Sequence, residues 1–332
     1  MSRVRYMMAR ILKLNYSQMF KTAKAISKKA HRSSVSIFFD MIHCGMKFQA
    51  GYYDYQEFEF YLMNDEQRAT FLTRGKNNAI IKKYNDKSLM PLFEDKIAFN
   101  GKFAAFIRRP WIDLRSATSE EWAAFLRENP RVIAKVLDGA GGEGIDKYSA
   151  GDDTSPEELL KLLKERKQVL VEAFIDQHEE LNRLYAGSVN TMRMFTFCKD
   201  GKGCFLQAIL KIGNGGVVDN FSGGGMYTFP DENGVVTVPA IDKKDDLHTT
   251  HPLTHTEIIG FQIPMFREAI ELVEKAAEVI PEVAYVGWDV AIGRNGPELI
   301  EGNPFPGVFQ KRASLTENKT GIIPLYRQYM EI

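Results

Sequence analysis

The sequence predicts an α+β fold with a mainly helical N-terminal region. Strand-forming runs joined by short turns recur from Arg131 onward, with helix signals between them, which favours mixed helices and hairpins. Ser34 to Asp95 is instead rich in aromatic residues at mixed spacing and short of glycine and proline, which is typical of packed helices. We therefore expect a helical region over residues 1–92 and an α+β domain over residues 93–332.

Composition sets the bounds for the core. A chain of 332 residues with 44% hydrophobic residues is long enough for one large or two medium domains without stapling. Cys44, Cys198 and Cys204 are odd in number and lack metal-ligand spacing, which favours structural thiols in a reducing, cytoplasmic compartment. The 43 basic and 43 acidic residues balance, so net charge indicates no partner.

The N-terminus has the most uneven charge. Between Met1 and Phe39 there are nine lysines and arginines and no acidic residue. Interleaved apolar residues make an irregular helical pattern, compatible with a basic amphipathic helix lying on anionic membrane lipid at the inner face. The alternative is a surface helix with a solvated basic face, and nucleic acid is not an expected partner. We find neither a signal peptide pattern nor a stretch long enough to span a bilayer.

A glycine-rich turn follows the first predicted strand. Thr118 to Glu121 is a capping box for a helix that should stop at Asn129-Pro130, and a strand then runs from Arg131 to Leu137. The turn contains glycines at four positions: Gly139, Gly141, Gly142 and Gly144. Three of them spell G-x-G-x-x-G, but we reject a dinucleotide fold because the next helix signal lies more than ten residues later, at Ser155-Pro156.

The same turn lacks the G-K-[ST] of phosphate-binding P-loops. What remains is a turn between two strands, where bare backbone N–H groups can fold over phosphates and Lys135 supplies a point charge. A plain flexible hairpin loop would explain the glycines as well.

Further elements follow in order. We expect a helix from Pro156 to about Lys167, a strand over Gln168 to Ile175, and a hairpin of Asn190–Cys198 with Cys204–Ile212. Arg193 lies on that hairpin, where an arginine fixed on a strand can clamp phosphate. The glycine-rich segment Gly213–Gly225 is too long for a mere turn and looks functional. Ile241 to His255 is interpreted as a polar surface loop whose histidines are not ligands, and a helix from Pro264 to Ile280 should back the last hairpin.

The last hairpin places oxygen ligands on one face. Strand-forming runs flank Arg294-Asn295-Gly296, which predicts a three-residue loop with Gly296 in the left-handed conformation. Counting back along each arm sets Asp289 opposite Glu301, and Asn303 projects from the same face as Glu301. Two carboxylates and an amide oxygen form a hard site that suits Mg²⁺. The alternative is an acidic hairpin face in solvent.

Taken together, these motifs resemble the ATP-grasp superfamily, most closely its branch associated with sugar transfer and cell-surface polysaccharide synthesis. The resemblance covers roughly Phe93 to the C-terminus, with lobes at about 115–175 and 176–332. It implies two lobes gripping ATP with Mg²⁺, with two ions expected. The implied roles are nucleotide lysines Lys96 and Lys135, an adenine hinge of Glu172, Ala173, Phe174 and Ile175, a clamp at Arg193, phosphate or acceptor contacts at Asp219 and Asn220, and metal ligands Asp289, Glu301 and Asn303.

The activity that the resemblance implies is carboxylate–amine ligation. A carboxylate takes the γ-phosphoryl of ATP, and an amine then displaces phosphate to leave an amide; either substrate could be a sugar or an amino acid. The alternatives are an ATP-dependent kinase of a small molecule or glycan, and a non-catalytic ATP-binding scaffold. Residues 1–95 do not resemble the βαβ unit that usually precedes the first lysine, so the sequence names neither the acid nor the amine.

Overall fold

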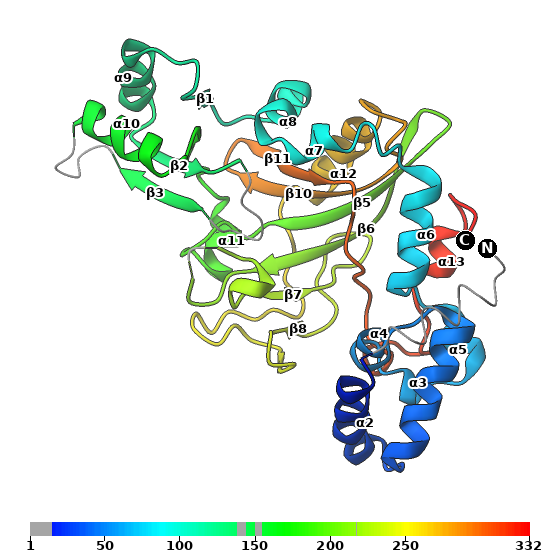
Figure 1. Cartoon of the computed structure of the whole chain (residues 1–332). Coiled ribbons are helices and arrows are strands. Elements are labelled where there is room, and N and C mark those ends of the chain that lie inside the picture. The colour runs from blue at the N-terminus through cyan, green and yellow to red at the C-terminus, as the bar shows by residue number, and fades with distance from the viewer. Residues whose placement is uncertain (1–14, 138–143, 150–154, 217) are drawn as a thin grey trace. The chain divides into compact units, whose positions relative to one another are not determined.

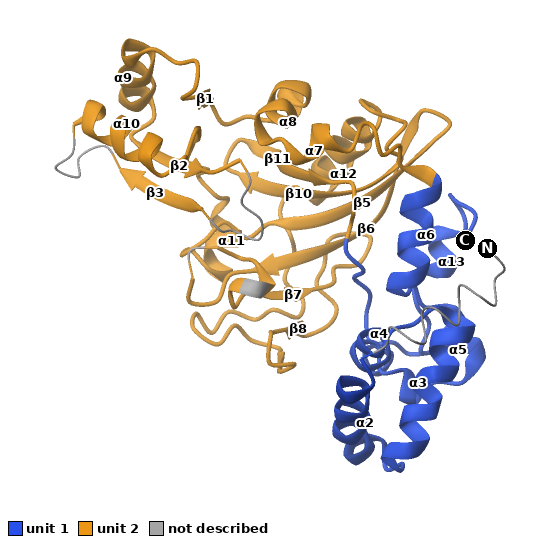
Figure 2. Ribbon diagram, viewed as in Figure 1, with its two compact units in different colours: residues 1–83, 307–332 blue, residues 84–306 orange. Residues whose placement is uncertain are grey.

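The computed structural model describes residues 15–137, 144–149, 155–216 and 218–332 (Figure 1). The chain divides into two compact units, residues 1–83 with 307–332 and residues 84–306 (Figure 2). The expected boundary at residue 92 therefore differs from this division, and the C-terminal segment groups with the N-terminal helices. The amide of Gln310 explains part of that grouping, because it donates to the Leu72 carbonyl at 2.7 Å and accepts from the Leu72 N–H at 3.2 Å.

Unit 1 is helical, as the aromatic-rich sequence predicts. Its helices are α2 (Tyr16–Ala30), α3 (Ser34–Phe48), α4 (Tyr52–Glu57), α5 (Asp65–Ala69), α6 (Arg74–Tyr84, which reaches the unit boundary) and α13 (Ile323–Tyr326), with short 3₁₀ turns at Phe60–Leu62 and Ala313–Leu315. Side-chain caps begin the two longest helices, since Asn15 accepts from the Gln18 N–H and Ser33 from the Ser36 N–H. In the described part of the chain, no helix is long and apolar enough to cross a bilayer.

Unit 2 contains two antiparallel sheets. The smaller has the order β1-β4-β2-β3, from β1 (Trp111–Asp113), β2 (Arg131–Lys135), β3 (Ile145–Ser149) and β4 (Leu170–Ala173). The larger has the order β11-β10-β5-β6-β7-β8-β9, from β5 (Met192–Lys199), β6 (Lys202–Ile212), β7 (Met226–Thr228), β8 (Ala240–Ile241), β9 (Leu247–His248), β10 (Tyr285–Gly293) and β11 (Gly296–Asn303). The helices are α7 (Pro91–Glu94), α8 (Lys96–Lys102), α9 (Ser119–Glu128), α10 (Pro156–Glu165), α11 (Glu179–Leu184) and α12 (Phe266–Ala277), with 3₁₀ turns at Ala104–Phe106 and Phe221–Gly223.

Helices α9 and α10 cover one face of the smaller sheet. Helix α9 begins with the predicted capping box at Thr118, and α10 begins at the predicted Ser155-Pro156 signal, which also forms a capping box. Alternation along β2 sends Val132 and Ala134 into this core, and it leaves Ile133 and Lys135 on the opposite face. The predicted pair of strands around the glycine-rich turn is confirmed, because β2 and β3 pair antiparallel.

Helix α12 covers the larger sheet. Its buried face packs against β5, β6, β10 and β11, in a core that also includes Trp288 and the phenylalanines Phe93, Phe99 and Phe103. Burying that face fixes the strands on which the predicted site residues lie. The expected surface loop over residues 241–255 is wrong in part: it contains β9, and His251 within it is fully buried.

Candidate active site

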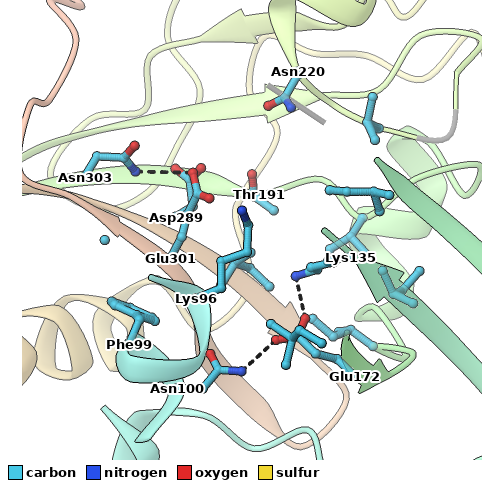
Figure 3. Close-up of a pocket in the computed structure, with 18 of the residues that line it drawn as sticks. Lys96, Phe99, Asn100, Lys135, Glu172, Thr191, Asn220, Asp289, Glu301 and Asn303 are labelled. Carbon is cyan, nitrogen blue, oxygen red and sulfur yellow. Dashed lines mark hydrogen bonds and ion pairs between the residues drawn. The ribbon is translucent and has the colours of Figure 1, made fainter. Parts of the chain in front are cut away.

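A cavity of about 790 Å³ opens in unit 2, and all of its lining residues belong to that unit. The small sheet contributes its uncovered face, and the large sheet contributes residues of β5, β6, β10 and β11. Figure 3 shows Lys96, Lys135, Glu172 and the set Asp289, Glu301 and Asn303 around the same space. The structure therefore brings together residues that are more than two hundred positions apart in the sequence.

The two predicted nucleotide lysines line this cavity. Lys96 is the first residue of α8, and the Asp95 carboxylate caps this helix by accepting from two backbone N–H groups. The Lys96 ammonium donates to the Leu137 carbonyl at 2.8 Å. Lys135 lies at the end of β2 and its Nζ is 2.5 Å from Oε2 of Glu172. Both cations are thus held by short contacts at the start of the glycine-rich turn.

Glu172 is the centre of a buried charge cluster. Its Oε1 accepts from Arg109 and from Asn100, both at 2.9 Å, and Arg109 also pairs with Glu298 at 2.9 Å. The side chain of Glu172 is only 3% exposed. Burial raises the pKa of this carboxyl, but Arg109 and Lys135 outweigh burial and hold the pKa well below its usual range. Glu172 therefore stays ionised.

The predicted hinge, Glu172 to Ile175, begins on β4 and continues past the end of that strand at Ala173. Ala173, Phe174 and Ile175 all line the cavity. The Phe174 ring lies 4.8 Å from the Arg131 guanidinium and 5.2 Å from the Lys147 ammonium, which fixes its orientation by cation–π attraction. Backbone and apolar surface at this end of the cavity suit a flat ring.

The glycine turn is described only at its end. Gly139, Gly141 and Gly142 lie outside the described residues. Gly144 has a φ of 69°, and a Cβ there would come within 2.4 Å of a Val136 methyl. That position therefore requires glycine for both its backbone conformation and its space.

The hairpin of β10 and β11 reaches the predicted pairing by a different route. Gly296 has a φ of 124° but pairs with Gly293, so the loop contains only Arg294 and Asn295 and the predicted three-residue loop is wrong. A bulge between Asp289 and Val290 then shifts the register by one, and it restores Asp289 opposite Glu301. The predicted pairing is thereby confirmed.

Asp289 is held by two cations. Arg193 on β5 donates to both of its carboxylate oxygens, and Lys211 on β6 donates to Oδ2 at 2.9 Å. Burial raises the pKa of Asp289, but Arg193 and Lys211 outweigh burial and lower the pKa far below its usual range. The arrangement follows from the sheet order, because Arg193 pairs directly with Asp289 across β5 and β10.

Glu301 and Asn303 complete the predicted metal set. The Glu301 side chain is 45% exposed and lies 3.9 Å from Nη2 of Arg193, while Asn303 donates to Glu301 at 3.4 Å. Its partial burial in the cavity, and then the neighbouring charge of Asp289, raise the pKa of Glu301. Glu301 is therefore a carboxylate whose charge the surrounding residues do not fully compensate.

Asp219 and Asn220 also line the cavity, on the second glycine-rich segment. Asp219 accepts from the N–H of Thr191 at 2.8 Å and from its hydroxyl at 2.6 Å. His251 anchors the start of the segment, since its Nδ1 accepts backbone N–H groups and its Nε2 donates to the Gly213 carbonyl at 2.8 Å. The segment is thus fixed to the large sheet beside Arg193.

The charged and amide residues of this site that sequence reasoning missed include Asn100, Arg109, Lys147 and Lys211. The signal for Lys211 was a lysine inside the apolar run of β6, where a buried charge needs a partner. Arg109 and Asn100 carry no comparable local signal.

The donor set fits a hard divalent cation. Asp219, Asp289 and Glu301 supply three carboxylates against the two cations Arg193 and Lys211, which leaves an excess of negative charge. Within the described ranges, no group of three or more histidine, cysteine and acidic side chains is placed to hold a metal, so the set rests on two carboxylates and the Asn303 amide. Asp289 would exchange its ion pairs for the metal.

No curated protein matches the chain. Among solved structures, it is similar to a biotin carboxylase from Campylobacter jejuni in complex with β-γ-ATP (14% identity, 77% of this chain and 52% of that chain, TM-score 0.44). It is also similar to the biotin carboxylase domain of a Hydrogenobacter thermophilus 2-oxoglutarate carboxylase (16%, 70% and 45%, TM-score 0.43) and to a D-alanine–D-alanine ligase from Bacillus anthracis complexed with ATP (16%, 65% and 55%, TM-score 0.34).

The chain spans about half the length of these three structures. A family model matches residues 75–321, which include every residue that lines the cavity. The chain belongs to the family of sugar-transfer associated ATP-grasp proteins, and its α+β fold is the ATP-grasp fold.

Proposed function

We propose that this protein is an ATP- and Mg²⁺-dependent carboxylate–amine ligase that acts through an acyl phosphate, in cell-surface polysaccharide modification. The observation that carries the proposal is one cavity that receives lysines from the small sheet and a cation–carboxylate set from the large sheet. Phosphoryl transfer needs mainly positioning and neutralisation of charge, so this combination supports it without a side-chain nucleophile. The family description adds the link to sugar transfer.

The proposed reaction has two steps. A carboxylate oxygen of the acid attacks the γ-phosphorus of ATP, the bond to the β–γ bridging oxygen breaks, and ADP leaves. The amine nitrogen then attacks the acyl carbon, the bond from that carbon to the phosphate oxygen breaks, and inorganic phosphate leaves as the nitrogen loses a proton. An amide, ADP and phosphate are the products.

Each end of the cavity has a role in this proposal. Backbone of Glu172–Ile175 meets the adenine, and Lys96 and Lys135 bind phosphate oxygens. Asp289, Glu301 and Asn303 would hold Mg²⁺, which supplies charge neutralisation across the transferred phosphoryl group. Arg193 and Lys211 lie beside them with positive charge, and the acceptor enters along Asp219 and Asn220.

The test is to trap the acyl phosphate. The protein is incubated with ATP, Mg²⁺ and hydroxylamine and with pooled amino acids and sugar carboxylates, but without an amine substrate. We expect hydroxamate and ADP to form together with the right acid, because a mixed anhydride reacts with the added nucleophile. Arg193→Ala should suppress both products, whereas Arg183→Ala, which removes an exposed arginine on α11, should suppress neither.

Two results would replace this proposal. A stable phosphorylated acceptor with no hydroxamate identifies a kinase on the same fold. Binding of ATP without release of ADP, across all acids and alcohols tried, identifies a non-catalytic scaffold.

A further inference from the structure

Helix α3 is apolar on two opposite faces. Ile37, Met41, Cys44 and Phe48 are buried in the core of unit 1. A second set at the spacing 4, 3, 4 lies on the outer side of the helix: Val35, Phe39, Ile42 and Met46. Phe39 is 64% exposed, Val35 55% and Met46 49%. An amphipathic surface helix would carry polar residues here, so this outer stripe is unusual for a face in water.

Aromatic residues of α2 extend the stripe sideways. Phe38, half-buried on α3, has its ring centroid 6.0 Å from that of Phe20 and 6.5 Å from that of Tyr16. It also contacts Phe39, at 5.8 Å. Phe20 and Tyr16 are 45% and 41% exposed. We call the outer stripe with Phe38, Phe20 and Tyr16 the aromatic face; α2 and α3 lie side by side in Figures 1 and 2.

Positive charge borders the aromatic face. Lys21, Lys24 and Lys28 are exposed on α2, and none has an acidic partner among the described residues. The acidic residues near α3 are already neutralised, since Asp40 pairs with Arg68 and Arg32 and Asp65 pairs with Lys47. Residues 1–39 contain nine cations and no acidic residue, so α2 keeps a positive surface.

The positive charge of α2 determines what kind of partner can bind the aromatic face. A second copy would bring the same positive surface against the face and would be repelled. In the sequence, residues 1–14 add four more cations and no acid. An anionic surface is attracted instead. Aromatic side chains beside lysines are the residues that interfacial helices place at the boundary between headgroups and acyl chains.

We propose that the aromatic face of unit 1 binds the surface of an anionic phospholipid bilayer. The exposed Phe39, Phe20 and Tyr16 enter the interface, and Lys21, Lys24 and Lys28 contact lipid phosphates. The binding is peripheral and depends on ionic strength, because the lysines act through charge that salt screens. It needs no activity in the cavity of unit 2, so it stands or falls separately from the ligase proposal.

The test is co-sedimentation of the full chain with vesicles. Vesicles of equal parts phosphatidylserine and phosphatidylcholine should bind the protein at low salt, and pure phosphatidylcholine should bind it much more weakly. Phe39→Ser with Met46→Ser should weaken binding by about a hundredfold, since each apolar side chain transferred from water contributes roughly tenfold. Lys21→Glu with Lys24→Glu and Lys28→Glu should weaken it about a hundredfold or more, at roughly fivefold per cation.

Matched controls test whether vesicle binding depends on the aromatic face or on exposed apolar residues and positive charge anywhere on the protein. Leu247→Ser with Ile259→Ser removes exposed apolar residues of unit 2, and Lys161→Glu with Lys164→Glu and Lys167→Glu reverses three exposed lysines there. Both controls should bind as the wild type does. Absence of binding to anionic vesicles, or equal losses in face and control variants, would overturn the proposal. So would a dimer in sedimentation that Phe39→Ser with Met46→Ser dissociates, because a second copy would then cover the face.

Discussion

The cavity of unit 2 contains two charge clusters that differ in their balance. At one end, Arg109 and Lys135 oppose Glu172 and Glu298, and both oxygens of Glu172 are engaged. At the other end, Arg193 and Lys211 oppose three carboxylates. The first cluster is neutral and deeply buried, whereas the second has one carboxylate more than its cations, and its Glu301 is partly exposed and only 3.9 Å from Arg193.

This difference in charge balance indicates that the two clusters have different roles. A neutral buried cluster is sensitive to mutation, because removing any member leaves a buried charge without a partner. A cluster with excess carboxylate is costly by itself and suits a cation that arrives from solvent. We therefore expect mutations at the Glu172 end to lower stability and mutations at the Asp289 end to lower turnover.

The largest expected effect follows from Arg109→Ala. This substitution leaves Glu172 and Glu298 buried against Lys135 alone, so the free energy of unfolding should fall by about 3–5 kcal/mol. Denaturant unfolding of the full chain measures it. Arg115→Ala is the matched control. The Arg115 side chain pairs with Asp113 but is 51% exposed, so its loss should leave the free energy of unfolding close to that of the wild type. Similar losses in both variants would remove the distinction between the clusters.

Glu301→Gln should lower turnover and leave stability almost unchanged, the reverse of Arg109→Ala. The amide keeps the shape but removes the excess charge, so ADP release with the right acid should fall about 10²–10³-fold, which corresponds to about 3–4 kcal/mol. Unfolding free energy should stay within about 0.5 kcal/mol, because the side chain is partly exposed and loses a like-charge neighbour. Glu282→Gln, at an exposed position outside the cavity, is the control and should change neither quantity. Wild-type turnover in Glu301→Gln would rule out the metal set.

Sequence patterns predicted this site where the interactions are local. The capping box at Thr118 and the helix-start signal at Ser155 predicted where α9 and α10 begin, and the strand pair around the glycine-rich turn follows from strand and turn signals. The pairing of Asp289 with Glu301 was predicted with the wrong loop length. It was reached because the bulge in β11 offsets the shorter loop, and a bulge of that kind leaves no clear signal in the sequence.

The missed residues depend on contacts between distant segments. Lys211 meets Asp289 only because β6, β5 and β10 are neighbours in one sheet, and Arg109 joins Glu172 to Glu298 across segments more than a hundred residues apart. The family resemblance was confirmed by the match over residues 75–321. The roles assigned to the cavity residues stay predictions until variants are measured.

The smallest expected effect tests whether Lys135 acts on nucleotide or only on Glu172. Lys135→Met keeps the aliphatic stem and removes the charge, so Mg-ATP affinity should weaken by about 1.5–3 kcal/mol, the range for a hydrogen bond to a charged group. The same variant leaves Glu172 and Glu298 against one cation, and this excess negative charge would also repel phosphate. Calorimetric titration with Mg-ATP measures the sum of the two effects.

The double variant Lys135→Met with Glu172→Gln separates them, because it restores one carboxylate to one cation in the cluster. If Lys135 contacts phosphate directly, the double variant should remain as weak as Lys135→Met. Recovery of wild-type affinity would show that Lys135 only neutralises Glu172, and the nucleotide role would then pass to Lys96, whose ammonium lines the same cavity. Glu172→Gln alone is the reference, since it leaves Lys135 without its carboxylate and should bind Mg-ATP at least as tightly as the wild type.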